Sequence, residues 1–107
     1  MTKLDGSVRR NSGKAIGSII IENGRTIVTE WSFSNKGDDT GWHIHQFDYV
    51  VVPMFTGELL IDTGDQRVIS SLQKGIPYFR QKGVEHNVIN ANDFSCKFIE
   101  IEFLPIK

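Results

Sequence analysis

The chain has little of several things that would otherwise define its class. It has one cysteine, Cys96, which excludes an intramolecular disulfide framework and is typical of a small core residue in a reducing compartment. Twelve basic residues against thirteen acidic ones leave a net charge of -1, so we expect no nucleic-acid partner. The longest apolar run, Tyr49 to Phe55, is far shorter than the about 20 residues of a membrane helix. We therefore expect no membrane partner either.

Length and composition predict one domain. A chain of 107 residues fits a single hydrophobic core and is too short to divide. The first residues are polar and basic at Arg9 and Arg10, without the apolar stretch of a signal peptide. We expect a loose N-terminal segment at 1–14, one domain at 15–107 and a cytoplasmic location.

Short β-branched and aromatic runs separated by turn residues predict an all-β fold, and no segment shows a sustained helical period. The clearest pair is the run that ends at Glu22 and the run Thr26 to Phe33. We interpret them as a hairpin closed by the two-residue turn Asn23-Gly24. Alternation in the second run places Trp31 and Phe33 on the core face. Further strands are expected at Glu58 to Asp62, Arg67 to Leu72, Ile76 to Arg80, His86 to Ile89 and Cys96 to Leu104. Strands of this number and length indicate a sandwich or barrel, and Pro53 should mark a bulge or an edge strand.

The three histidines of the chain all lie in two short motifs. Side chains at i and i+2 of an extended strand share a face, so His43 and His45 would present two imidazoles side by side. His86, on a later strand that folds back, would add a third ligand and leave positions open for water, substrate or oxygen. The alternative is a metal-free pocket, since a single imidazole on a strand is more often a core or surface residue. The two motifs are Gly37-x5-His43-x-His45 and Gly75-x5-Gln81-x-Gly83-x2-His86-x3-Asn90.

Over Gly37 to Asn90 the chain resembles the cupins, small jelly-roll β-barrels whose two motifs carry a metal site. The first family motif, Gly-x5-His-x-His-x3 or x4-Glu-x6-Gly, is matched at Gly37, His43, His45 and Gly57. The second, Gly-x5-Pro-x-Gly-x2-His-x3-Asn, is matched at Gly75, Gly83, His86 and Asn90, with Gln81 in place of the proline. The resemblance implies a cupin-like jelly-roll β-barrel, a bound metal ion and pairing into a homodimer.

The glutamate of the first motif is missing, since its place falls at Tyr49 or Val50. The nearest carboxylate, Asp48, comes one position early, and alternation puts it on the face opposite His45, so we favour a structural or solvent-facing role for it. A site of three neutral imidazoles keeps the full charge of the ion, which favours anionic substrates. Some cupin dioxygenases resemble this chain in lacking the glutamate, which favours iron, whereas imidazole ligands also suit zinc, nickel or copper.

Three further side chains are candidates for catalysis. Tyr49 shares the face of His43 and His45 by alternation, so its hydroxyl is placed to orient a bound water or substrate. An inward Arg80, beside Tyr78, would pair with a carboxylate substrate, and an inward Glu100 would serve as a general base. For Arg80, Glu100 and the neighbouring Glu102 we nevertheless favour a solvent-facing position, because buried unpaired charges are costly.

These features favour a mononuclear, dioxygenase-like metalloenzyme that acts on a small organic acid or a diketone-like compound. The alternative is a non-catalytic small-ligand binding or sensor module in the same barrel, because one fold hosts many functions. A structural protein with a vestigial site is the third reading. Turnover separates the first from the second, since both are compatible with metal binding.

Overall fold

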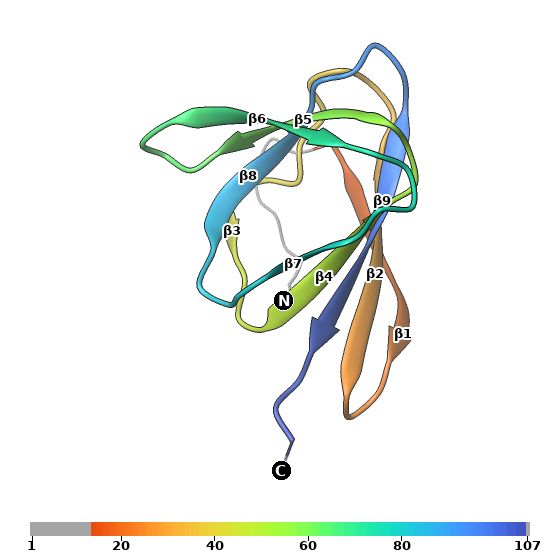
Figure 1. Cartoon of the computed structure of the whole chain (residues 1–107), viewed down its shortest axis with the longest axis vertical. Coiled ribbons are helices and arrows are strands. Elements are labelled where there is room, and N and C mark those ends of the chain that lie inside the picture. The colour runs from red at the N-terminus through yellow and green to blue at the C-terminus, as the bar shows by residue number, and fades with distance from the viewer. Residues whose placement is uncertain (1–13, 107) are drawn as a thin grey trace.

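Two antiparallel sheets face each other and enclose the core in the computed structural model of the chain, which describes residues 14–106 (Figure 1). The described residues form strands and no helix, so none of them crosses a membrane as a helix. This arrangement confirms the predicted all-β jelly roll. The predicted loose segment 1–14 lies, except for Lys14, outside the described residues.

The larger sheet has five strands in the order β1-β2-β9-β4-β7. Its central strand, β9, is the last in sequence, and it pairs with β2 on one side and β4 on the other. The strands are β1 (Ile16–Glu22), β2 (Thr26–Phe33), β4 (Asp48–Pro53), β7 (Tyr78–Arg80) and β9 (Cys96–Phe103).

The smaller sheet has four strands in the order β3-β8-β5-β6. The β5–β6 hairpin projects to one side of the barrel, and the β1–β2 hairpin and the end of β9 project from the other sheet (Figure 1). The strands are β3 (His43–Ile44), β5 (Gly57–Asp62), β6 (Arg67–Leu72) and β8 (Glu85–Asn90).

The β1–β2 hairpin is confirmed, but its loop differs from the prediction. Three residues, 23–25, separate the strands instead of two. The Asn23 side chain accounts for the difference, because its Oδ1 accepts the backbone N–H groups of Arg25 and Thr26, both at 2.8 Å. The Asn23 N–H also donates to the Thr26 carbonyl at 3.0 Å, so Asn23 and Thr26 close the turn around Gly24 and Arg25, one residue later than predicted.

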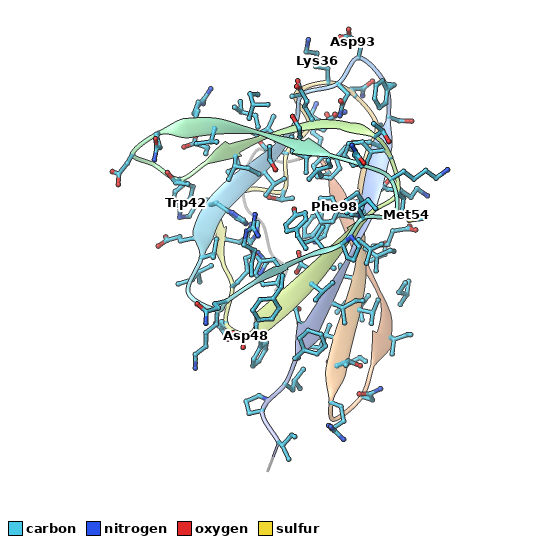
Figure 2. The ribbon with its side chains drawn as sticks, in the orientation of Figure 1. Lys36, Trp42, Asp48, Met54, Asp93 and Phe98 are labelled. Atoms are coloured by element: carbon cyan, nitrogen blue, oxygen red, sulfur yellow. The ribbon has the colours of Figure 1, made fainter. Side chains whose placement is uncertain are left out.

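The core lies between the sheets and is built from alternate residues of each strand. Phe33 and Leu59 are almost fully buried, and the rings of Phe33 and Phe98 pack with centroids 5.7 Å apart. Figure 2 shows Phe98 between the two sheets. Each such side chain contributes about 1.5–3 kcal/mol by leaving water. Phe33 lies in this core and Trp31 packs against it, as predicted for that face of β2.

Pro53 marks neither a bulge nor an edge strand, so that prediction is wrong. It is the last residue of β4, which lies between β9 and β7. Proline is tolerated there because β7 pairs only with residues 49–51 of β4, so β7 does not reach Pro53.

Two residues of the family motifs, Gly57 and Asn90, belong to a buried polar network. Asn90 lies about 13 Å along β8 from His86, at the other end of the strand. Its Nδ2 donates to two backbone carbonyls in neighbouring loops, both at 3.1 Å, and its Oδ1 accepts from Asn92 Nδ2 at 2.8 Å. Asn92 in turn accepts the Glu58 N–H and leaves no room for a side chain at Gly57. These two motif residues therefore close the end of the barrel and do not contact the histidines.

Candidate metal centre

The three histidines meet at one point although they come from different segments. β3 pairs with β8 so that His43 lies directly opposite His86, and His45 follows β3 immediately. The Nε2 atom of His45 lies 3.2 Å from that of His43 and 3.2 Å from that of His86. The predicted convergence of the three imidazoles is present in the structure.

Hydrogen bonds at the far side of the rings define which nitrogens face the centre. His43 Nδ1 lies 2.9 Å from the carbonyl oxygen of Gly41, which only accepts, so Nδ1 carries the proton and Nε2 keeps its lone pair. His45 Nδ1 faces Glu100 Oε2 at 3.8 Å, on the side of the ring away from the other two histidines. Lone pairs that face one another at hydrogen-bonding distance require a cation or a proton between them.

A metal ion fits this donor set. Two nitrogens held about 2.1 Å from one ion and about 100° apart lie about 3.2 Å from each other, which is the separation that the His45 Nε2 atom keeps from both neighbours. The ligand atoms of the three histidines all lie within 4.8 Å of one another. The arrangement suits a metal bound by three imidazoles, and it leaves the identity of the metal open.

Burial keeps two of these imidazoles neutral, as a metal ligand must be. Burial, and next the charges of His43 and His86, lower the pKa of His45 to about 2. Burial likewise lowers the pKa of His86 to about 3, helped by the charges of His43 and Arg80. At neutral pH both rings are therefore ready to bind a cation without first losing a proton.

Tyr49 lies beside the histidines, but the reason is not alternation along one strand. β3 belongs to the smaller sheet and β4 to the larger one, so the chain changes sheets between His45 and Asp48. Tyr49 is 3% exposed, and its ring stacks on that of His45 with centroids 3.8 Å apart and planes 15° apart. Burial raises the pKa of the Tyr49 phenol, so it stays protonated.

Glu100 is buried, which corrects the solvent-facing position that we favoured for it. β9 is the central strand of the larger sheet, and its Phe98, Glu100 and Glu102 face turns inward. Burial, and next the charge of Glu102, raise the pKa of Glu100 to about 8, so the carboxyl is largely protonated at neutral pH. Ligand atoms of His45, Glu100 and Glu102 lie within 4.8 Å of one another. The carboxyl groups nearest the histidines thus come from β9 and not from the first motif.

Arg80 is exposed, as favoured, yet it borders the same cavity. Its guanidinium lies over the Tyr78 ring, 4.5 Å from the centroid, and donates to the carbonyl of Phe79 at 2.9 Å.

Asp48, by contrast, is structural, as predicted. Its Oδ1 accepts the Lys82 N–H at 2.9 Å, and Figure 2 shows it near the start of β4.

The histidines line a cavity of about 300 Å³ between the sheets. Several polar and aromatic residues that line this cavity were not predicted from the sequence. Thr40 Oγ1 lies 3.3 Å from His43 Nδ1, and Trp31 stacks against His43 at 6.4 Å between centroids. Thr40 and Gly41 lie within the first motif, directly before the histidines, which is the signal that would have pointed to them. Apolar residues from both sheets complete the wall: Val51, Leu59, Ile61, Val68 and Ile69.

Fold and site together define a small cupin with a three-histidine pocket, and comparison with known proteins agrees. The chain is similar to a cupin domain from Bordetella pertussis, with 49% identity, a TM-score of 0.84 and coverage of 90% of this chain and 99% of that one. It is 45% identical over 89 residues to the beta-alanine degradation protein BauB of Pseudomonas aeruginosa, which covers 83% of this chain and 93% of BauB. A cupin-2 domain protein from Shewanella frigidimarina is 28% identical, with a TM-score of 0.58 over 89% of this chain and 85% of that one. No protein-family model matches the chain. The chain belongs to the cupins.

Proposed function

We propose that this cupin binds one divalent metal ion at His43, His45 and His86 and acts as a dioxygenase-like enzyme on a small organic acid. The observation that carries the proposal is the convergence of the Nε2 atoms, at 3.2 Å from His45 to each neighbour. Iron is the metal that we favour, because the proposed chemistry uses oxygen. When bound, the ion would supply positive charge and open positions for substrate and oxygen.

The size and charge of the cavity support a small anionic substrate. A volume of about 300 Å³ is at the lower end for ligand pockets. With no ionised carboxylate among the proposed ligands, the charge of the ion stays uncompensated and attracts an anion. BauB is named for degradation of beta-alanine, a small molecule with a carboxylate, and this supports an organic acid over a diketone-like compound.

Three further side chains would then bind the substrate, hold a histidine ligand in place and transfer a proton. The guanidinium of Arg80, at the border of the cavity, would pair with the substrate carboxylate. The Tyr49 ring would hold the His45 imidazole in place, and its hydroxyl would donate to a bound oxygen atom. Glu100 would exchange a proton with the substrate, since its pKa of about 8 lies near neutrality.

Metal content is the first test. We expect about one equivalent of iron in protein purified without a chelator or a histidine tag, and its loss in His86→Ala. Asp48→Asn is the matched control, because this carboxylate contacts the Lys82 N–H and should leave metal content unchanged. Absence of metal in the wild type, with none taken up on adding iron, zinc, nickel or copper, would contradict the proposal.

Oxygen uptake is the second test. Both atoms of dioxygen enter the product of a dioxygenase, so one molecule of oxygen should disappear per substrate without any added reductant. The screen should hold beta-alanine, other small carboxylic acids and a 1,3-diketone. A carboxylate that raises the melting temperature of the metal-bound protein but is never turned over would favour the binding or sensor module instead.

A further inference from the structure

One wall of the cavity is a row of apolar side chains from three neighbouring strands of the smaller sheet. Residues that pair directly in an antiparallel sheet point to the same side. Val88 of β8 pairs with Ile61 of β5, and Ile61 pairs with Val68 of β6. All three side chains line the cavity, and together they form what we call the apolar row.

The apolar row becomes more exposed toward the edge of the sheet. Val88 is 6% exposed and belongs to the core, Ile61 packs partly buried against that core, and Val68 on the edge strand is 46% exposed. Apolar surface that is open toward a cavity favours a ligand that removes it from water, in proportion to the area covered. Ile61 and Val68 therefore favour an apolar group in this part of the cavity.

The smaller sheet offers no partner for a charged group beside the apolar row. Apart from the histidines, the charged residues among the described residues that line the cavity are Arg80 and Glu100, and both belong to the larger sheet. Glu100 lies against His45, 3.8 Å from its Nδ1. An ammonium group at the row would lose its water without gaining a partner, which is costly. The row thus selects methyl and methylene groups.

The distance between the histidines and the apolar row sets the length of the ligand. His86 and Val88 lie two residues apart on the same side of β8, which corresponds to about 6.8 Å along the strand. A zigzag hydrocarbon chain advances about 1.3 Å per bond, so about five bonds cover this distance. The cavity of about 300 Å³ has the volume of about ten water molecules in the liquid, which leaves room for such a chain.

The hairpin that carries Val68 is held by the residue directly before His43. The Trp42 ring lies 3.3 Å from the position that a Cβ atom of Gly64 would take, in the turn between β5 and β6. Trp42 Nε1 also donates to Glu85 Oε2 at 2.6 Å, and Figure 2 shows Trp42 below this hairpin. The apolar row is therefore fixed relative to the segment of the metal ligands, as a preformed ligand pocket requires.

We propose that the substrate is an aliphatic carboxylate of about four to six carbons, with its carboxylate at the histidines and Arg80 and its hydrocarbon chain against the apolar row. This inference rests on the proposed function and narrows its substrate class. Butanoate and beta-alanine test it directly, because they share one skeleton and differ only in a methyl group where beta-alanine has an ammonium group.

The test is the affinity of the zinc-loaded full chain for carboxylates, measured by isothermal titration calorimetry. Zinc is not redox-active, so it holds a ligand without oxygen chemistry. Affinity should rise about two- to fourfold with each CH₂ group from acetate to hexanoate. Butanoate should bind at least about tenfold more tightly than beta-alanine, because the ammonium group finds no partner at the row.

Val68→Thr replaces one methyl group of the apolar row by a hydroxyl with little change of shape. It should weaken hexanoate binding about threefold or more and leave acetate binding within about 1.5-fold, since acetate does not reach the row. Val28→Thr is the matched control, because Val28 lies on β2 outside the lining of the cavity. It should bind both acids like the wild type, and circular dichroism would verify that both variants fold.

Three results would overturn the inference and leave the metal site intact: equal or unmeasurable affinities along the series, beta-alanine bound as tightly as butanoate, or Val68→Thr bound to hexanoate like the wild type. A chain that holds no zinc would instead contradict the proposed function. The same series on the metal-free chain then decides the inference, since the apolar row is present without the ion. Affinity that rises with chain length there supports the row, and affinity that does not rise overturns it.

Discussion

The Tyr49 ring lies flat against the His45 imidazole, with centroids 3.8 Å apart, at one of the two positions that the glutamate of the first cupin motif would take. A ring in this place supports a ligand from the side and adds no negative charge. The pocket thus holds an aromatic ring against His45 and keeps two histidines neutral by burial. This contact, together with the buried Glu100, distinguishes the pocket from one with a glutamate ligand.

Two substitutions of Tyr49 separate the contribution of its ring from that of its hydroxyl. Tyr49→Phe keeps the stacking, so metal affinity should stay within about threefold, while turnover falls if the hydroxyl donates to a bound oxygen atom. Tyr49→Ala leaves a cavity, which should lower the free energy of unfolding by about 3–5 kcal/mol and weaken metal binding tenfold or more. Urea unfolding and competition with a chelator measure the two effects. Equal loss of metal in both variants would show that the hydroxyl, and not the ring, supports the site.

The stability of the metal-free protein should fall as the solution is acidified below pH 6.5. The pKa values of His45 and His86 are lowered from 6.5 to about 2 and about 3, so below pH 6.5 the unfolded chain binds more protons than the folded one. Each histidine then costs up to about 1.4 kcal/mol of unfolding free energy per pH unit. Urea unfolding from pH 4 to 9 measures this, and saturating metal should raise the stability without removing the dependence, because the folded chain holds both histidines unprotonated in either state.

The raised pKa of Glu100 predicts that the stability of the protein also falls when the solution is made alkaline. Its pKa is raised from 4.5 to about 8, so the stability that it contributes is complete below pH 4.5 and is lost as the pH rises through 8. The two histidines outweigh the single carboxyl below pH 6.5, and maximum stability is expected near that value. Glu100→Gln, which cannot ionise, should remove the alkaline decline and steepen the fall in stability between pH 6.5 and 4.5, where the carboxyl no longer opposes the histidines. An alkaline decline that persists in Glu100→Gln would assign it to another group.

Gly57 should tolerate no side chain. A Cβ atom there would overlap Asn92 Oδ1, which already accepts the Glu58 N–H at 2.8 Å. We expect Gly57→Ala to lower the free energy of unfolding by about 2 kcal/mol. Gly24→Ala is the control, because nothing lies within 4 Å of its Cβ position, and it should cost less than about 0.5 kcal/mol. Similar losses in both variants would mean that the clash with Asn92 does not account for the effect of Gly57→Ala.

Cys96 should react slowly with alkylating reagents while the protein is folded. The side chain is buried, and burial raises the pKa of its thiol, so little thiolate is available at neutral pH. Iodoacetamide labelling followed by mass spectrometry should give rates at least tenfold lower than in urea. Rapid labelling of the folded chain would indicate that the β9 end of the barrel opens readily.

Most strands could be predicted because their patterns are local. Thr26–Phe33 and Arg67–Leu72 match the expected strands, and the other expected strands named above differ by one or two residues at their ends. β7 begins at Tyr78 and not at Ile76, because Gly75 has a φ of 81° and Pro77 has no N–H to pair. The three histidine ligands could also be proposed from the sequence, since residue type and spacing in two motifs suffice to suggest a metal site.

The sequence by itself determined the fold class and the residues that share a face, because the period of two along a strand is a local property. For β9 it did not determine which face is inside. That was decided when β9 took the centre of the larger sheet and when the chain changed sheets between His45 and Asp48. These two tertiary features buried Glu100 and stacked Tyr49 on His45, because strand neighbours distant in sequence decide which side of a strand faces water.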